Sequence, residues 1–154
     1  MKKLLVVLFL AVAFCSCTTT SPMLYRWGGY EYLYHQYYKT QTPESYAQLY
    51  IAYNALVTNP GGARSTVPPG ICAEFGYMLL EPETSAILID YYNNPNHFPI
   101  KQRKEMEGTD WNQVIAPELL REKGMKMLRK EIELYPESAT FLAPIINKFS
   151  QQQP

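Results

Sequence analysis

Proline and glycine residues divide the chain beyond residue 40 into short segments, and within each segment the apolar side chains recur at helical spacing. Thr42-Pro43-Glu44 carries three signals of a helix start, namely a capping hydroxyl, a proline at the first position and an acid in the first turn. The apolar pattern that follows continues to about Thr58 and stops before Asn59-Pro60-Gly61-Gly62. The sequence therefore predicts one amphipathic helix from Pro43 to Thr58.

The same pattern of proline and glycine residues predicts three further helices. Val67-Pro68-Pro69-Gly70 introduces a helix over 71–80, which Glu81-Pro82 ends. Pro117 opens a longer helix that Pro136 terminates, and Pro136-Glu137-Ser138 then starts a last helix, in which Pro144 is expected to cause a kink. We therefore expect an all-α fold, a single small helical domain over residues 24–150 with a frayed tail over 151–154.

Aromatic residues crowd the segment from Leu24 to Tyr38, in which seven of fifteen residues are Tyr or Trp. Beyond the turn expected at Gly28-Gly29, apolar and aromatic side chains recur at helical spacing. One hypothesis is an aromatic platform that binds sugar rings or a partner strand. The other, which we favour, is that tyrosine edges pad a small helical core and keep their hydroxyls in water.

The first residues have the pattern of a secretory signal. Lys2 and Lys3 precede an apolar run from Leu4 to Phe14, which is shorter than the roughly 20 residues needed to span a bilayer. The run ends in Phe14-Cys15-Ser16-Cys17, which resembles a bacterial lipobox. This resemblance predicts a signal peptide over 1–16, acylation of Cys17 with chains such as palmitate, and a short tether over 17–23. The alternative is an ordinary secreted protein that is cleaved near Ser16.

Charge and cysteine content indicate where the protein is located and which ligands it is not expected to bind. The 14 basic and 14 acidic residues balance, so the sequence lacks the excess of positive charge that is typical of proteins that bind nucleic acid. Loss of Lys2 and Lys3 would leave 12 basic side chains and a net charge near −2. Thr18 in place of an Asp favours transfer to the outer membrane, and the absence of an acidic cluster favours its periplasmic leaflet. Cys72 would then have no intramolecular partner and is expected to be a buried apolar residue.

The titratable residues do not form a pattern typical of catalysis or metal binding. Neither His35 nor His97 has a second ligand at helical spacing, and no nucleophile-elbow motif is present. Glu131 and Glu133 lie on different faces of the predicted helix and are interpreted as part of a solvated face together with Lys126, Arg129 and Lys130. We therefore expect no enzymatic activity, no metal and no cofactor.

Three motifs resemble a family of bacterial lipoproteins, the one known as domain of unknown function 4810. They are Leu24-Tyr25-x-Trp27-Gly28-x-Tyr30, then Val67-Pro68-Pro69-Gly70-Ile71-x-Ala73-Glu74-x-Gly76-Tyr77, and Lys130-Glu131-x-Glu133-Leu134-Tyr135-Pro136-Glu137-Ser138. The resemblance extends from about Leu24 to Phe149, with a segment of about 82–117 inserted. A helix with Phe75, Gly76 and Leu79 beside one with Gly124 and Leu128 also resembles a tetratricopeptide hairpin.

The family resemblance implies an accessory subunit of an outer-membrane assembly that contains a lipoprotein resembling the curli secretion channel. We expect a non-enzymatic adaptor that binds envelope proteins, including other outer-membrane lipoproteins. Its expected partner-binding surface joins Leu24–Tyr30 to Arg64–Gly70 and contains Tyr25, Trp27, Tyr30, Pro68 and Pro69. The alternative is a lipoprotein that binds peptidoglycan or another carbohydrate through exposed Tyr and Trp residues. Whether segment 82–117 is ordered stays open.

Overall fold

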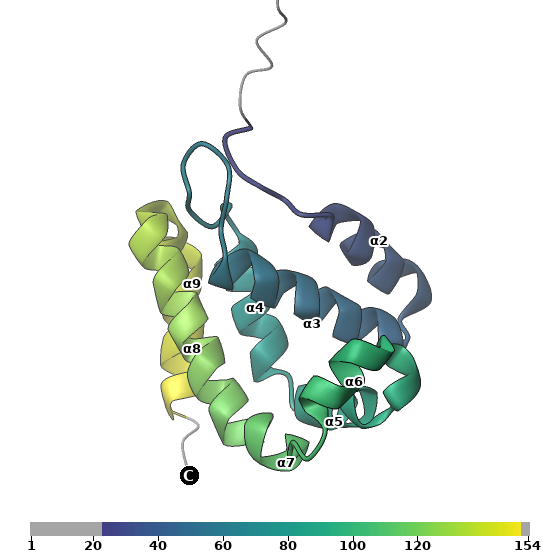
Figure 1. Ribbon diagram of the computed structural model, residues 1–154. Coiled ribbons are helices and arrows are strands. Elements are labelled where there is room, and N and C mark those ends of the chain that lie inside the picture. Colours follow the sequence, from purple (N-terminus) through teal and green to yellow (C-terminus); the bar gives the residue numbers. More distant parts are fainter. Residues whose placement is uncertain (1–22, 152–154) are drawn as a thin grey trace, which may run out of the picture.

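A computed structural model describes residues 23–151, and in this range every regular element is a helix (Figure 1). The all-α prediction is confirmed. The predicted signal peptide, Cys17, nearly all of the tether and residues 152–154 lie outside the described residues. The longer helices are α2 (Tyr30–Thr40), α3 (Pro43–Thr58), α4 (Ile71–Leu80), α5 (Thr84–Asn93), α8 (Pro117–Leu134) and α9 (Ala139–Gln151). Within residues 23–151, none is both long enough and apolar enough to cross a bilayer.

The predicted helix starts and stops are confirmed where local capping decides them. The Thr42 hydroxyl accepts a hydrogen bond from the Ser45 backbone N–H, and the Ser45 hydroxyl accepts one from the Thr42 N–H, both at 3.2 Å. This reciprocal pair satisfies two donors that a helix N-terminus otherwise leaves free. Helix α4 has its predicted bounds, and helix α8 begins at Pro117 as expected. A short 3₁₀ turn over Pro136–Ser138 precedes α9.

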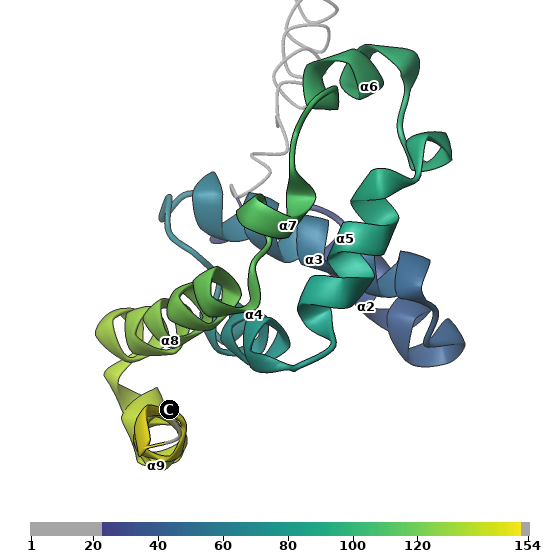
Figure 2. The ribbon, with the colours of Figure 1, turned by 90° about the horizontal axis from the view of Figure 1, so that it is seen from below.

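Helices α4 and α8 lie side by side in both ribbon views, and two glycines allow their backbones to meet (Figures 1 and 2). A Cβ atom at Gly76 would lie 2.7 Å from Leu128 Cδ2 and 3.0 Å from the Gly124 carbonyl oxygen. A Cβ atom at Gly124 would lie 2.9 Å from the Gly76 carbonyl oxygen. The predicted pairing of these two helices is therefore confirmed, while its likeness to a tetratricopeptide repeat stays a prediction.

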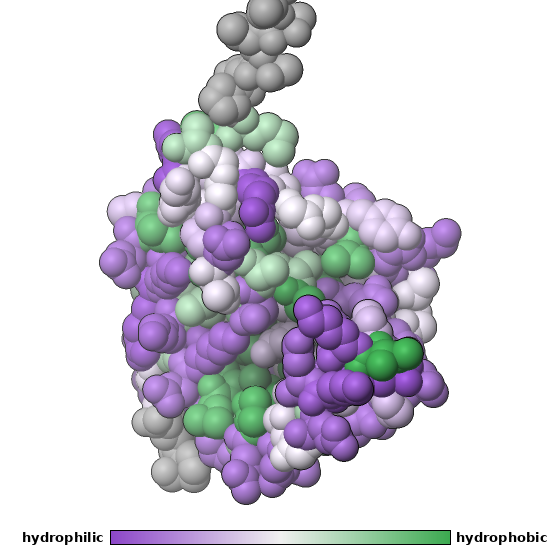
Figure 3. Space-filling view, in the orientation of Figure 1, coloured by the Kyte–Doolittle hydropathy of each residue, from purple (hydrophilic) through white to green (hydrophobic). Residues whose placement is uncertain are grey.

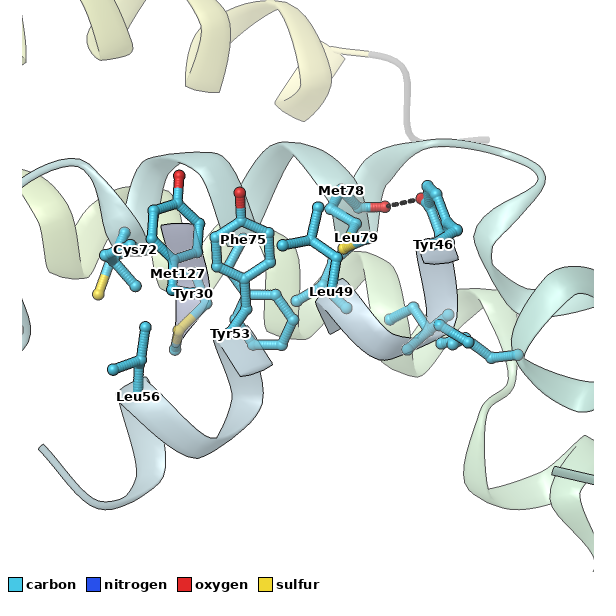
Figure 4. Close-up of a cluster of buried hydrophobic side chains, with 14 of the residues drawn as sticks. Tyr30, Tyr46, Leu49, Tyr53, Leu56, Cys72, Phe75, Met78, Leu79 and Met127 are labelled. Carbon is cyan, nitrogen blue, oxygen red and sulfur yellow. Dashed lines mark hydrogen bonds between the residues drawn. The ribbon is translucent and has the colours of Figure 1, made fainter. Parts of the chain in front are cut away.

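The core is formed mainly by one face each of α3, α4 and α8 (Figure 4). Phe75 and Cys72 are completely buried in it, which confirms the expectation for Cys72. Burial raises the pKa of the Cys72 thiol to about 11. Tyrosines supply much of this core, as we favoured, but the hydroxyls of the buried ones bind protein groups. Tyr46 Oη, for example, donates to the Met78 carbonyl oxygen at 3.2 Å.

The segment expected as an insertion is ordered and adds to the core. Helix α5 packs on α3 and buries Leu88 completely. Beyond it, a 3₁₀ turn over Pro95–His97 leads to α6 (Ile100–Met106) and α7 (Trp111–Val114). The rings of Tyr92 and Trp111 stack at 4.5 Å and join α5 to α7. Helix α6 has no buried residue and projects from the body of the molecule (Figure 2).

Candidate functional site

The two segments that were expected to form one surface meet at their N-terminal ends. Residues 23–26 run beside the loop at 61–64, and three backbone hydrogen bonds join them. The Ala63 N–H donates to the Met23 carbonyl at 2.9 Å and the Arg64 N–H to the Leu24 carbonyl at 3.1 Å. Gly62 has a φ of +87° and approaches so closely that a Cβ atom there would lie 2.7 Å from Tyr25 Cα. We call this arrangement the N-terminal clamp.

Three of the five predicted partner-binding residues remain accessible. Tyr25 is half-buried beside Arg64, whose Nη1 donates to the Tyr25 hydroxyl at 2.8 Å. The Arg64 guanidinium lies 5.6 Å from the centre of the Tyr25 ring. Pro69 is exposed, and Trp27 is half-buried against the core. Tyr25 and Pro69 are therefore available to a partner, whereas Trp27 mainly supports the fold.

The prediction was wrong for Tyr30 and Pro68, which are both buried. Tyr30 is the first residue of α2, and its ring packs on Tyr53 of α3 with 5.3 Å between ring centres. Pro68 lies in the turn before α4, where the preceding carbonyl of Val67 accepts a hydrogen bond from the Tyr135 hydroxyl at 2.5 Å. Both residues are buried by contacts with residues distant in the sequence, Tyr53 and Tyr135, which the local sequence pattern does not reveal.

A second surface, which the sequence analysis did not identify as a site, is a cavity of about 300 Å³ between α2, α3 and α4. We call it the tyrosine groove. Six of its ten lining residues are tyrosines, and its only charged residues are two glutamates. The lining consists of Tyr34, Tyr37, Tyr38, Tyr46, Leu49, Tyr53, Glu74, Tyr77, Met78 and Glu81.

The carboxylate of Glu74 is held at the groove by two phenols. Its Oε2 atom accepts a hydrogen bond from the Tyr53 hydroxyl at 2.7 Å and another from the Tyr30 hydroxyl. Burial, followed by these bonds to the carboxylate, raises the pKa of both tyrosines. Both phenols therefore stay protonated and keep donating. The Glu74 side chain is itself exposed, so a fixed negative charge is available to a ligand.

Several of the aromatic rings that line the groove are accessible. The rings of Tyr34 and Tyr38 lie 4.6 Å apart, and Tyr38 is 60% exposed. A hydrogen bond with Tyr38 and then burial raise the pKa of Tyr34 to about 12. Tyr77 on α4 is also exposed. Electron-rich ring faces beside the carboxylates of Glu74 and Glu81 form a site that suits a cation.

Glu131 does not lie on a solvated face, and that prediction was wrong. Its side chain is only 2% exposed, and its Oε1 accepts a hydrogen bond from the Gly70 N–H at 2.7 Å. The backbone N–H groups of Cys72 and Ala73 also face this carboxylate, whose Oε2 atom makes no hydrogen bond to any described residue. Glu131 of α8 therefore caps the N-terminus of α4. Burial raises the pKa of Glu131, and the three backbone donors oppose that rise.

Neither histidine of the chain lies in the tyrosine groove. A ring nitrogen of His97 lies 3.0 Å from the Tyr91 carbonyl oxygen, and the two rings stack at 4.3 Å. Residues 23–151 contain no cluster of three or more histidine, cysteine or acidic side chains that could hold a metal ion. The groove offers a ligand two carboxylates, aromatic ring faces and phenolic hydroxyls.

Comparison with known proteins identifies a family but no relative of known function. No curated protein and no solved structure matches the chain. Residues 24–99 match a family described as a domain of unknown function, DUF4810. The match begins at the expected residue and covers α2 to α5, hence the whole tyrosine groove, whereas the motif around Glu131 lies beyond it. The chain belongs to the DUF4810 family.

Proposed function

We propose that this protein is a non-enzymatic adaptor of the bacterial envelope, anchored through acylated Cys17 to the periplasmic leaflet of the outer membrane. It acts as an accessory subunit of an outer-membrane assembly, and its partner is another envelope lipoprotein, of the kind that resembles the curli secretion channel. The observation that best supports binding is the tyrosine groove, because it joins accessible aromatic rings to a carboxylate that two phenols hold in place.

The composition of the groove favours a basic side chain of the partner as its ligand. An Arg or Lys entering the groove would meet Glu74 and Glu81 and no positive charge among the lining residues. Its cationic head could also stack on Tyr34 or Tyr38, a contact worth about 0.5–2 kcal/mol depending on how far it is desolvated. Phenolic hydroxyls at the rim would accept its remaining N–H groups.

Two tyrosines of the same helix provide a matched test. Tyr38 lines the groove and is 60% exposed, whereas Tyr32 is 66% exposed and is not part of the lining. We expect Tyr38→Ser to reduce recovery of an envelope partner from crosslinked, detergent-solubilised membranes, and Tyr32→Ser to leave recovery unchanged. Equal recovery with both variants would show that the groove does not bind the partner.

A second candidate function, the binding of peptidoglycan or another glycan, is favoured by the ring faces of Tyr34 and Tyr38, on which sugar rings could stack. The protein would then sediment with purified peptidoglycan, and Tyr38→Ser would abolish this while Tyr32→Ser would not. Sedimentation that is absent in the wild type would exclude this function and leave the adaptor proposal in place.

A further inference from the structure

The N-terminal clamp lies close to the predicted lipid anchor. Only five residues of chain lie between Cys17 and Met23, so the six extended steps from one to the other would span roughly 20 Å. The three backbone hydrogen bonds between 23–26 and 61–64 fix the first described residues to the loop. An anchor at Cys17 would therefore hold this particular end of the domain near the membrane.

The accessible side chains of the clamp match those of a membrane-surface contact. Met23 is 65% exposed and Leu24 is 50% exposed, although both are apolar. Apolar surface gathers where the described chain begins (Figure 3). Arg26 and Arg64 flank these residues and are both exposed. Apolar side chains that enter the headgroup layer beside arginines that bind phosphate form the usual pattern of interfacial anchoring.

The two arginines are held in place rather than free to fold away. The Arg26 side chain lies along Gly61, where a Cβ atom would be 3.1 Å from Arg26 Cδ. Arg64 is fixed by its hydrogen bond and ring contact with Tyr25. Among the described residues, the bond to Tyr25 is the only hydrogen bond that the Arg64 side chain makes, so its other N–H groups remain available to an acceptor.

We propose that the N-terminal clamp rests on the membrane, with Met23 and Leu24 in the headgroup layer and Arg26 and Arg64 bound to anionic lipid phosphates. This inference rests on the proposed lipid anchor. It gives the domain a fixed orientation, in which the clamp faces the lipid. The tether thereby determines the orientation of the domain as well as its distance from the membrane.

Fluorescent labels at two positions test this orientation in the intact acylated protein. Ala63→Cys places a label in the clamp, and Gln113→Cys places one on α7, at the opposite end of the molecule in Figure 1. Cys72 is buried and stays unlabelled in the folded protein. The protein is reconstituted into vesicles of phosphatidylethanolamine and phosphatidylglycerol that carry a nitroxide headgroup quencher. We expect strong quenching at position 63 and little at position 113.

Charge variants test the role of the arginines. Each basic residue near an anionic surface contributes about fivefold to binding, so Arg26→Ala/Arg64→Ala should lower the ratio of docked to undocked domains about 25-fold. A matched control, Lys101→Ala/Lys104→Ala on the exposed α6, should retain the quenching at position 63. Circular dichroism would confirm that both variants fold.

The possible failures are distinct. Equal quenching at positions 63 and 113 in protein that floats with the vesicles would overturn the proposed orientation and leave the lipid anchor supported. Protein that does not float would overturn both the anchor and this inference, whereas the partner-capture test of the tyrosine groove would keep its own result.

Discussion

Replacing Glu131 with alanine is expected to destabilise the fold by about 2–4 kcal/mol. The substitution removes the acceptor of the 2.7 Å hydrogen bond from Gly70 and of the interactions with the Cys72 and Ala73 N–H groups, all at the buried start of α4. A hydrogen bond to a charged group contributes about 1.5–3 kcal/mol, and a carboxylate at a helix N-terminus adds about 0.3–1 kcal/mol. Alanine relieves the cost of burying the carboxylate but leaves the Gly70 N–H without an acceptor, and we take these two opposing effects as roughly equal. The melting temperature should fall by roughly 10 °C.

Glu131→Gln separates the hydrogen bond from the charge. Glutamine keeps an oxygen for the Gly70 N–H but does not titrate. The pKa of Glu131 is raised in the folded state, so the folded protein binds this proton more tightly than the unfolded chain does. The free energy of unfolding of the wild type should therefore rise, relative to Glu131→Gln, as the pH falls from neutral through the folded-state pKa toward 4.5.

Urea denaturation and thermal melts of the three proteins at several pH values measure both effects. Alanine should be the most destabilising substitution, and the stability of the wild type relative to Glu131→Gln should fall as the pH rises. A melting temperature of Glu131→Ala within about 2 °C of the wild type would refute the capping role. A difference that grows with rising pH would refute the assignment of the shift to burial.

Three further predictions concern the packing of the core. Gly124→Ala should destabilise the protein by about 1–3 kcal/mol in denaturant titration, although alanine is the better helix former, because its Cβ would meet the Gly76 carbonyl oxygen at 2.9 Å; unchanged stability would contradict the close approach. Thr84→Val should cost about 1–2 kcal/mol in thermal melts, because the buried hydroxyl donates to the Met78 carbonyl and lies 2.5 Å from the Tyr46 hydroxyl; a more stable variant would contradict this. The Cys72 thiol, with its pKa raised to about 11 and no exposed surface, should react with a disulfide reagent at pH 8 only as fast as the protein opens, and immediate reaction in the native state would contradict its burial.

Local chemistry explains why the sequence predicts most of the helices. The bounds of α3 and α4 depend on the Thr42 cap, the flanking prolines and Gly70, all of which act within one turn of the helix end. The pairing of Gly76 with Gly124 is also visible in the sequence, since each is a small residue on an apolar helix face.

Tertiary contacts explain what the sequence does not reveal. The spacing of Glu131 indicates its place on α8 but not that the N-terminus of α4 lies against it. Burial of Tyr30 likewise depends on Tyr53 and Glu74, which are supplied by two other helices. The tyrosine groove could not be predicted for the same reason, because its lining residues come from three helices that only the fold brings together.

Photocrosslinking from inside the tyrosine groove in living cells tests whether this groove binds an envelope partner. A photoreactive phenylalanine analogue at position 38 should crosslink to an envelope protein, whereas the same analogue at position 32, on the same helix but outside the groove, should not. Loss of the adduct in Glu74→Gln/Glu81→Gln would support recognition of a cation. Adducts of equal yield from positions 38 and 32, or none from position 38, would contradict the assignment of the groove as the partner-binding site.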